Sequence, residues 1–205
     1  MMNEHEWDYF PTLELRRNVL SLDLESTAVK DFRDLNDVKA NVVVVYDPLT
    51  EESWRFVRDE AQGVDLETLP LDSLRDMLLG WYEQGRFIGG QNILGFDFPV
   101  LMGDSSLNVC DILQAFIDSR QYIDTAQYMK NKLGFRVSLK YMVNSTLGDD
   151  KIMDGADAPS EWLKGNYTEV IEYCEKDTTL WSNLHTFGVQ NRFILLGGAK
   201  IPVDW

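Results

Sequence analysis

The sequence predicts one α/β domain in which helices flank a mixed, five-stranded sheet. Three observations favour this fold class: a strand with alternating leucines, a hairpin after it, and a second half in which strands alternate with helices. Antiparallel strands followed by strand–helix units are typical of a mixed sheet covered by helices. The 205 residues, 44% of them hydrophobic, are enough to build one packed core.

The first half is predicted to form a three-stranded antiparallel meander. In Val19–Glu25 leucine at 20, 22 and 24 alternates with the polar residues Ser21, Asp23 and Glu25, which predicts a strand with one apolar face. The β-branched run Val42–Val45, the turn sequence DPLTEES and a second run at Trp54–Val57 predict a hairpin. The hairpin and the first strand together make the meander.

The second half is predicted to alternate between helices and short strands. Apolar residues recur at helical spacing behind Pro70, which predicts a helix as far as Glu83. A period near 3.6 also predicts a long helix over 166–187. Between them we expect strands at 86–92 and 121–125 and helices at 96–103 and 109–119.

Composition limits the classes of function. There are 34 acidic and 19 basic residues, a net charge of −15, which argues against a broad basic surface that coats duplexes. A nucleic-acid enzyme with divalent cations in its cleft stays possible, because bound metals reverse the local field. The two cysteines and two histidines match no zinc pattern, and no apolar run approaches the length of a membrane span. We expect a cytoplasmic protein without membrane segments.

Three acidic motifs stand out. Asp23 and Glu25 lie two apart on a predicted strand and share one face, as on a solvated surface or in a site for a hard cation such as Mg²⁺. Asp97 begins a predicted helix, where Asp is also a common N-cap. Tyr173 and Asp177 are four apart on a predicted helix, so their side chains share one face and can contact the same ligand. A partly buried Tyr beside an exposed Asp is the more ordinary interpretation of such a pair.

Taken together, these motifs resemble a known family. The patterns Asp23-x-Glu25, Asn92-x-x-x-Phe96-Asp97 and Tyr173-x-x-x-Asp177 are similar, in order and context, to the three motifs of the DEDD (DnaQ-like) 3′-5′ exonucleases. The tyrosine places the resemblance in the DEDDy branch. It spans roughly residues 17–188 and is strongest to the proofreading domains of family B DNA polymerases and to small stand-alone predicted exonucleases.

The resemblance implies a ribonuclease-H-like fold and a two-metal phosphodiester hydrolase. Two Mg²⁺ or Mn²⁺ ions would be held by four acids, with Asp23 bridging both, Glu25 and Asp177 on the nucleophile side and Asp97 on the second ion. Tyr173 would orient the attacking water. The implied reaction is 3′-5′ hydrolysis at single-stranded or frayed 3′ ends, with DNA favoured over RNA.

Other residues would bind the substrate. Asn92, Phe96 and Phe98 would shape a pocket for the terminal nucleotide, although both phenylalanines equally suit core packing. Lys140 closes the segment 128–140, which holds four cations and no acid and suits either phosphate contact or a solvated helix face. Asp124 falls where the family often carries a further Asp.

Two alternatives remain beside the exonuclease. One is a catalytically weak nuclease fold kept as a nucleic-acid-binding or scaffolding module. The other, a two-carboxylate glycosidase, is weaker because Asp23 and Glu25 would lie on the same side of a substrate.

We divide the chain into an N-terminal extension (1–16), the exonuclease-like domain (17–190) and an apolar tail (191–205), which suits either folding back or contact with a partner. We expect no polymerase, helicase or accessory RNA-binding domain in it, so a recruiting protein partner is also compatible with the sequence.

Overall fold

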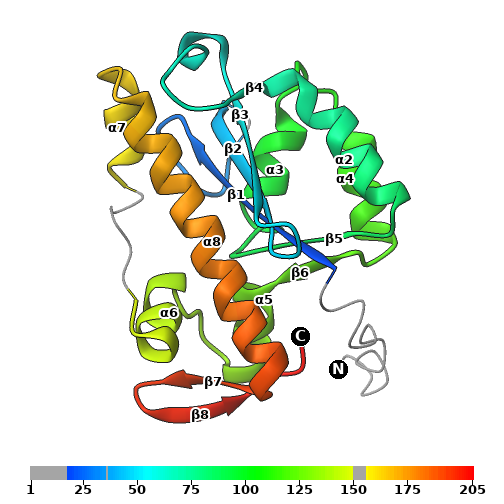
Figure 1. Cartoon of the computed structure of the whole chain (residues 1–205), viewed down its shortest axis with the longest axis vertical. Helices are drawn as coiled ribbons and strands as arrows, with labels where there is room; N and C mark the ends of the chain where they lie inside the picture. Colours follow the sequence, from blue (N-terminus) through cyan, green and yellow to red (C-terminus); the bar gives the residue numbers. More distant parts are fainter. Residues whose placement is uncertain (1–17, 36, 150–155) are drawn as a thin grey trace.

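The computed structural model describes residues 18–35, 37–149 and 156–205, and the predicted N-terminal extension lies outside these ranges. A six-stranded mixed sheet runs through the molecule in the order β4-β3-β2-β1-β5-β6 (Figure 1). The first three strands form the antiparallel meander, and the other neighbours pair in parallel. The strands are β1 (Val19–Ser26), β2 (Ala40–Asp47), β3 (Glu52–Val57), β4 (Leu69–Pro70), β5 (Phe87–Gly90) and β6 (Tyr122–Asp124).

The mixed α/β architecture predicted from the sequence is confirmed, and its central sheet has one strand more than the five expected. The extra strand, β4, has two residues and pairs with the end of β3. A pair this short has no periodicity, so the sequence pattern assigned Pro70 to a helix start instead. That helix begins later, after a 3-10 turn at Leu71–Ser73. The α-helices are α2 (Leu74–Glu83), α3 (Asp97–Gly103), α4 (Cys110–Asp118), α5 (Thr125–Leu133), α6 (Leu139–Leu147), α7 (Ala158–Leu163) and α8 (Tyr167–Asn191).

Helices cover both faces of the sheet. On one face the leucines of β1 pack in a buried cluster with α2, α3 and α4. On the other face the long helix α8 crosses β1 and β2, as Figure 1 shows in orange, and Val42 and Val44 pack against Tyr173 and Cys174. The alternation along β1 therefore decides which residues meet α8.

A side chain of helix α8 lies directly against strand β5. A Cβ atom at Gly89 would overlap the ring of Trp181, and both Gly89 and Gly90 are buried. The indole Nε1 of Trp181 donates to Thr125 Oγ1 over 2.9 Å, and Thr125 Oγ1 donates to Gln91 Oε1 over 2.6 Å. Glycine in β5 thus allows a contact that sets the position of α8 along the sheet.

The apolar tail folds back onto the domain. Strands β7 (Phe193–Leu196) and β8 (Ala199–Pro202) form a hairpin against α6 and α8, at the bottom of Figure 1. Ile194, Val203 and Trp205 are buried in the same cluster as Trp181. Of the two possibilities the sequence left open, folding back is the one that the structure contains.

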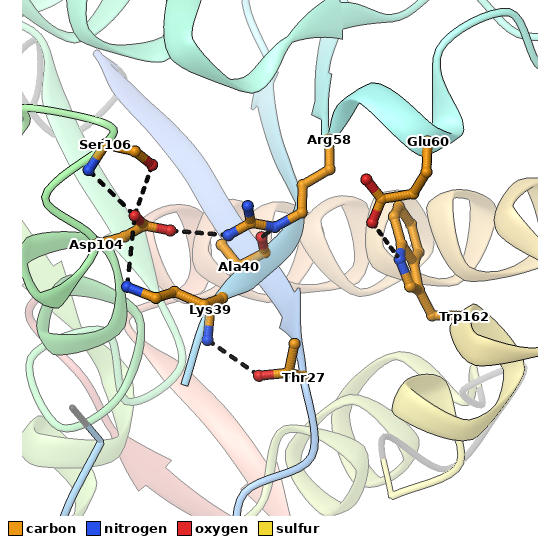
Figure 2. Close-up of polar contacts among 8 residues, drawn as sticks. All are labelled: Thr27, Lys39, Ala40, Arg58, Glu60, Asp104, Ser106 and Trp162. Carbon is orange, nitrogen blue, oxygen red and sulfur yellow. Dashed lines mark hydrogen bonds and ion pairs between the residues drawn. The ribbon is translucent and has the colours of Figure 1, made fainter. Parts of the chain in front are cut away.

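A polar network ties the meander to the segment after α3. Asp104 is 4% exposed and accepts hydrogen bonds from Ser106 and from Arg58 Nη2, the latter over 2.8 Å (Figure 2). Lys39 forms an ion pair with the same carboxylate over 3.5 Å, and its backbone N–H donates to Thr27 Oγ1. The start of the loop after β1 is therefore fixed to the start of β2.

In the ranges that the structure covers, we find no helix with the length and apolar character needed to traverse a bilayer.

Candidate active site

The first pair of acids lies on the α8 side of the sheet. Asp23 and Glu25 oppose Val44 and Val42 of β2, which pack against α8, while the leucines between them enter the opposite core. The thiol of Cys174 lies 3.4 Å from the backbone carbonyl oxygen of Asp23 and 3.7 Å from its Oδ2. Both carboxylates are half-buried, so the strand surface that carries them is not an ordinary solvated one.

Asp97 comes from the connection after β5. It begins α3, but Phe96 occupies the N-cap position and no side chain caps the helix, so the alternative of an ordinary N-cap is not what the structure contains. Asp97 is 2% exposed, and its Oδ1 atom has no hydrogen-bond partner among the described residues. Burial, followed by the nearby charge of Asp23, raises the pKa of Asp97 well above its usual range.

Tyr173 and Asp177 lie one turn apart on α8, and both are buried. Burial and the charge of Asp177 raise the pKa of Tyr173 far above that of a free phenol. The hydroxyl therefore stays protonated near neutral pH and can donate a hydrogen bond.

These residues meet in one cavity of about 740 Å³, which we call the acidic cavity. Its lining includes all five residues predicted to be catalytic: Asp23, Glu25, Asp97, Tyr173 and Asp177. They come from β1, α3 and α8, and the outermost two, Asp23 and Asp177, are 154 positions apart in the sequence. This size is in the usual range of small-molecule sites.

The predicted substrate-binding residues divide into two groups. Asn92 and Phe96 line the acidic cavity. Phe98 is 1% exposed in the core with α4 and does not line it, so here the alternative of core packing is correct. Lys140 is an exposed residue of α6 and is also absent from the lining.

Asp124 holds the loop that carries Asn92. Its carboxylate accepts backbone N–H groups from Asn92 over 3.1 Å, Leu94 over 3.0 Å and Gln127 over 3.0 Å. The last of these bonds caps α5. Asn92 itself has φ 66°, a left-handed conformation that Asn tolerates better than most residues. Asp124 thus positions the segment leading to Asp97 and is not part of the cavity lining.

The lining also includes Gln91, Phe32 and Arg136, which were not predicted as site residues. Gln91 follows β5 and donates to the Val137 carbonyl over 2.8 Å. Phe32 lies in the loop after β1, and Arg136 lies between α5 and α6. Arg136 belongs to the basic segment noted in the sequence, but its proximity to the acids is a tertiary contact that no local pattern indicates.

The donor set of the acidic cavity fits divalent cations. Carboxylate oxygens are the ligands that Mg²⁺ and Mn²⁺ prefer, and a buried carboxylate with an oxygen lacking a partner, as in Asp97, is a ready ligand. Among the residues that the structure describes, no three ligating side chains stand close enough to hold one ion as they lie. Metal binding would therefore require side-chain movements.

Comparison with known proteins gives one line of evidence. No family model matches the chain, and no curated protein matches it. Among solved structures it is similar to the family B DNA polymerase from the hyperthermophilic archaeon Pyrobaculum calidifontis, with a TM-score of 0.57 and 13% identity.

The match covers 83% of this chain and 24% of the polymerase chain. At this identity the likeness bears on the fold alone. The chain thus has a ribonuclease-H-like α/β fold, similar to a part of a DNA polymerase.

Proposed function

We propose that the protein is a metal-dependent 3′-5′ exonuclease of the DEDDy type. It would hydrolyse phosphodiester bonds at the 3′ end of single-stranded or frayed nucleic acid, with DNA as the favoured polymer. One observation carries the proposal: β1, α3 and α8 bring four carboxylates and a protonated tyrosine to a single cavity. Two cations would offset the repulsion among four carboxylates.

The roles of the side chains follow from their positions. Asp23, Glu25, Asp97 and Asp177 would hold two Mg²⁺ or Mn²⁺ ions, which when bound supply Lewis acidity and an activated water. The leucines of strand β1 are buried in the core, so the strand holds Asp23 and Glu25 in place. Tyr173 would orient the attacking water through its hydroxyl, since its phenol is not ionised. Asn92 and Phe96 line the space left for the terminal nucleotide.

The test uses 5′-labelled single-stranded DNA, single-stranded RNA and a 3′-recessed duplex, each incubated with Mg²⁺ or Mn²⁺. The wild type should give a ladder that shortens from the 3′ end and disappears with EDTA. Asp23→Ala and Asp177→Ala should abolish it, whereas Asp65→Ala removes an exposed acid outside the cavity and should not. A wild type as inert as both cavity variants on all three substrates would refute the exonuclease.

A second candidate is a catalytically weak module that binds nucleic acid or serves as a scaffold. The observation that favours it is the spacing of the acids, because no three of them are close enough to hold an ion as they lie. In that case the wild type would bind oligonucleotides but would release no nucleotides with either metal.

A further inference from the structure

We propose that Phe32 and Arg136 form a clamp at the acidic cavity for the unpaired end of a nucleic acid strand. Phe32 would stack on a base, and Arg136 would pair with a backbone phosphate. The inference rests on the proposed function in one respect only, that the ligand of the cavity is a nucleic acid.

Phe32 is unusually exposed for an aromatic residue. It is 74% exposed, yet it lines the acidic cavity, and its ring centroid lies 6.0 Å from that of Phe96 at an interplanar angle of 44°. The tilt leaves much of the ring open to solvent instead of covered by its neighbour. An exposed aromatic face beside a polar site is the usual platform for an unpaired base.

The loop that carries Phe32 is fixed where it leaves the sheet. Thr27 and Lys39 exchange two hydrogen bonds, from Thr27 N to Lys39 O over 2.8 Å and from Lys39 N to Thr27 Oγ1 over 3.0 Å. Figure 2 shows the second bond beside the Asp104 network. The loop that carries Phe32 is therefore anchored at both of its ends. This anchoring limits the conformational entropy that the loop loses when a ligand stacks on Phe32.

Arg136 is the only lysine, arginine or histidine in the lining of the acidic cavity, counted over the described residues. It is exposed and makes no hydrogen bond or ion pair with any residue that the structure describes. Its guanidinium is a planar fork of donors that matches a phosphate in two-point contact. Within the described part of the lining, Arg136 is thus one cation beside four acids, which suits a polyanionic ligand that the acids would otherwise repel.

The two contacts together favour an unpaired strand. In a duplex both faces of an internal base are already stacked, so only an unpaired or frayed nucleotide offers a face to Phe32. Arg136 adds a contact to the backbone, which a free base lacks. Stacking and phosphate pairing tolerate any sequence, so the clamp would hold strand ends without base preference.

Affinity tests the stacking contact without requiring cleavage. We would measure the fluorescence anisotropy of a labelled single-stranded DNA in Ca²⁺, with a phosphorothioate at the 3′-terminal linkage to resist hydrolysis. Phe32→Ala should bind roughly 5- to 150-fold more weakly, and Phe32→Trp should bind as tightly as wild type. Phe135→Ala is the matched control, because Phe135 is 61% exposed and outside the cavity lining.

A ligand change shows whether Phe32 meets a base. Removing bases one at a time near the 3′ end should weaken wild-type binding at one position by the same factor as Phe32→Ala. At that position the two changes should not add, because each removes the same contact. Full additivity at every position would overturn the stacking contact.

Salt dependence tests the phosphate contact. Arg136→Ala should reduce the slope of log Kd against log salt by about 0.7, the value for one phosphate contact on a single strand. Lys200→Ala removes the same charge on β8, outside the cavity, and should leave the slope unchanged. An unchanged slope for Arg136→Ala would overturn this half of the clamp.

The outcomes separate the clamp from the proposed activity. If the wild type degrades DNA but Phe32→Ala and Arg136→Ala match it in affinity, the clamp is wrong and the exonuclease stands. If both variants lose affinity while the wild type never cleaves, the clamp stands and the exonuclease is wrong. A wild type that binds no oligonucleotide overturns both.

Discussion

The side chain of Asp97 is a carboxyl group that is buried next to another acidic residue. A carboxylate that is 2% exposed and next to Asp23 is costly to ionise, and the raised pKa of Asp97 expresses that cost. The thiol of Cys174, on α8, also lies beside Asp23. Burial, followed by the charge of Asp23, raises the pKa of Cys174, so this thiol stays neutral. A neutral thiol of α8 thus lies beside Asp23, and in the proposed function a divalent cation would supply the counter-charge.

We predict that Asp97→Asn stabilises the protein in the absence of metal. A carboxyl whose folded pKa is raised binds its proton more tightly in the folded state, so stability falls as pH rises from its ordinary pKa of 3.8 through the folded pKa. The amide avoids this loss. Urea denaturation in EDTA should give the variant on the order of 1 kcal/mol more stability at pH 8, with a smaller gap at pH 5. A less stable variant at pH 8 would contradict the prediction.

Tyr173 supplies a hydroxyl and no charge, so its loss should be milder than the loss of an acid. Tyr173→Phe keeps the ring in its buried site and removes one donor, which is worth about 10²-fold in rate for a positioned hydrogen bond. Single-turnover cleavage of labelled DNA measures the effect, and Asp177→Ala should be slower than Tyr173→Phe. If the two variants lose activity equally, the hydroxyl does more than orient water.

At the scale of elements, the placement of α8 brings its two site residues to β1. The residue that permits this placement is Gly89, because Trp181 lies directly over it. A substitution there acts through the helix and not through any ligand.

We predict that Gly89→Ala costs about 1–3 kcal/mol of stability, since the added methyl group has no free space. Gly80→Ala is a matched control in α2, where an added Cβ meets nothing within 4 Å, and it should stabilise the protein by about 0.5–1 kcal/mol. Urea denaturation of both variants checks the pair. A Gly89→Ala protein as stable as wild type would mean that α8 is not held closely at this position.

The Asp104 network joins β2 and β3 to the segment after α3, and it should be sensitive to acid. Burial would raise the pKa of Asp104, but hydrogen bonds from Ser106 and Arg58 outweigh burial and leave the pKa lowered. A lowered folded pKa contributes stability above the unfolded value of 3.8, and this contribution is lost as pH falls through the folded pKa.

Asp104→Asn should therefore destabilise the protein by about 1.5–3 kcal/mol at pH 7 and by less below pH 3.8. Denaturation curves over this pH range measure the difference. Asp118→Asn, at an exposed position at the end of α4, should show no comparable loss. A gap between wild type and Asp104→Asn that stays constant down to pH 2 would contradict the assignment.

At the scale of the whole molecule, the net charge of −15 is partly concentrated in one cavity. Cations that bind only the folded protein stabilise it by mass action, by about 2.7 kcal/mol at one hundred times the Kd. We predict that Mg²⁺ and Mn²⁺ raise the Tm of the wild type and of Asp65→Ala, and that EDTA reverses the increase. Asp97→Asn should respond much less, and an equal response would place the cations elsewhere.

Much of this fold could be predicted from local patterns. The alternation in β1 and the helical spacing in α8 depend on backbone geometry that repeats every 2 or 3.6 residues, so a short window of sequence shows them. Elements without such a repeat were harder to predict. Strand β4 is too short, and Pro70 suits both a strand end and a helix start.

The residues of the candidate site also fall into two groups, those that local patterns indicate and those that only tertiary packing places. The spacing of Asp23, Glu25, Tyr173 and Asp177 is local, so the order of residues already indicated which side chains share a face. Phe96 and Phe98 have the same local context, yet one lines the cavity and the other fills the core, because the loop held by Asp124 and the start of α3 direct them differently. Only the packing of separate elements distinguishes them.

The placement of Phe32 and Arg136 at the acidic cavity depends wholly on tertiary structure. They are 104 positions apart and share no motif, and what unites them is the cavity that both line. The amino-acid sequence alone thus indicated which carboxylates share a face of a strand or helix, because shared faces follow from local backbone periodicity. The approach of an aromatic ring and a cation to those carboxylates was decided by long-range packing of the sheet, the loop after β1 and the connection before α6.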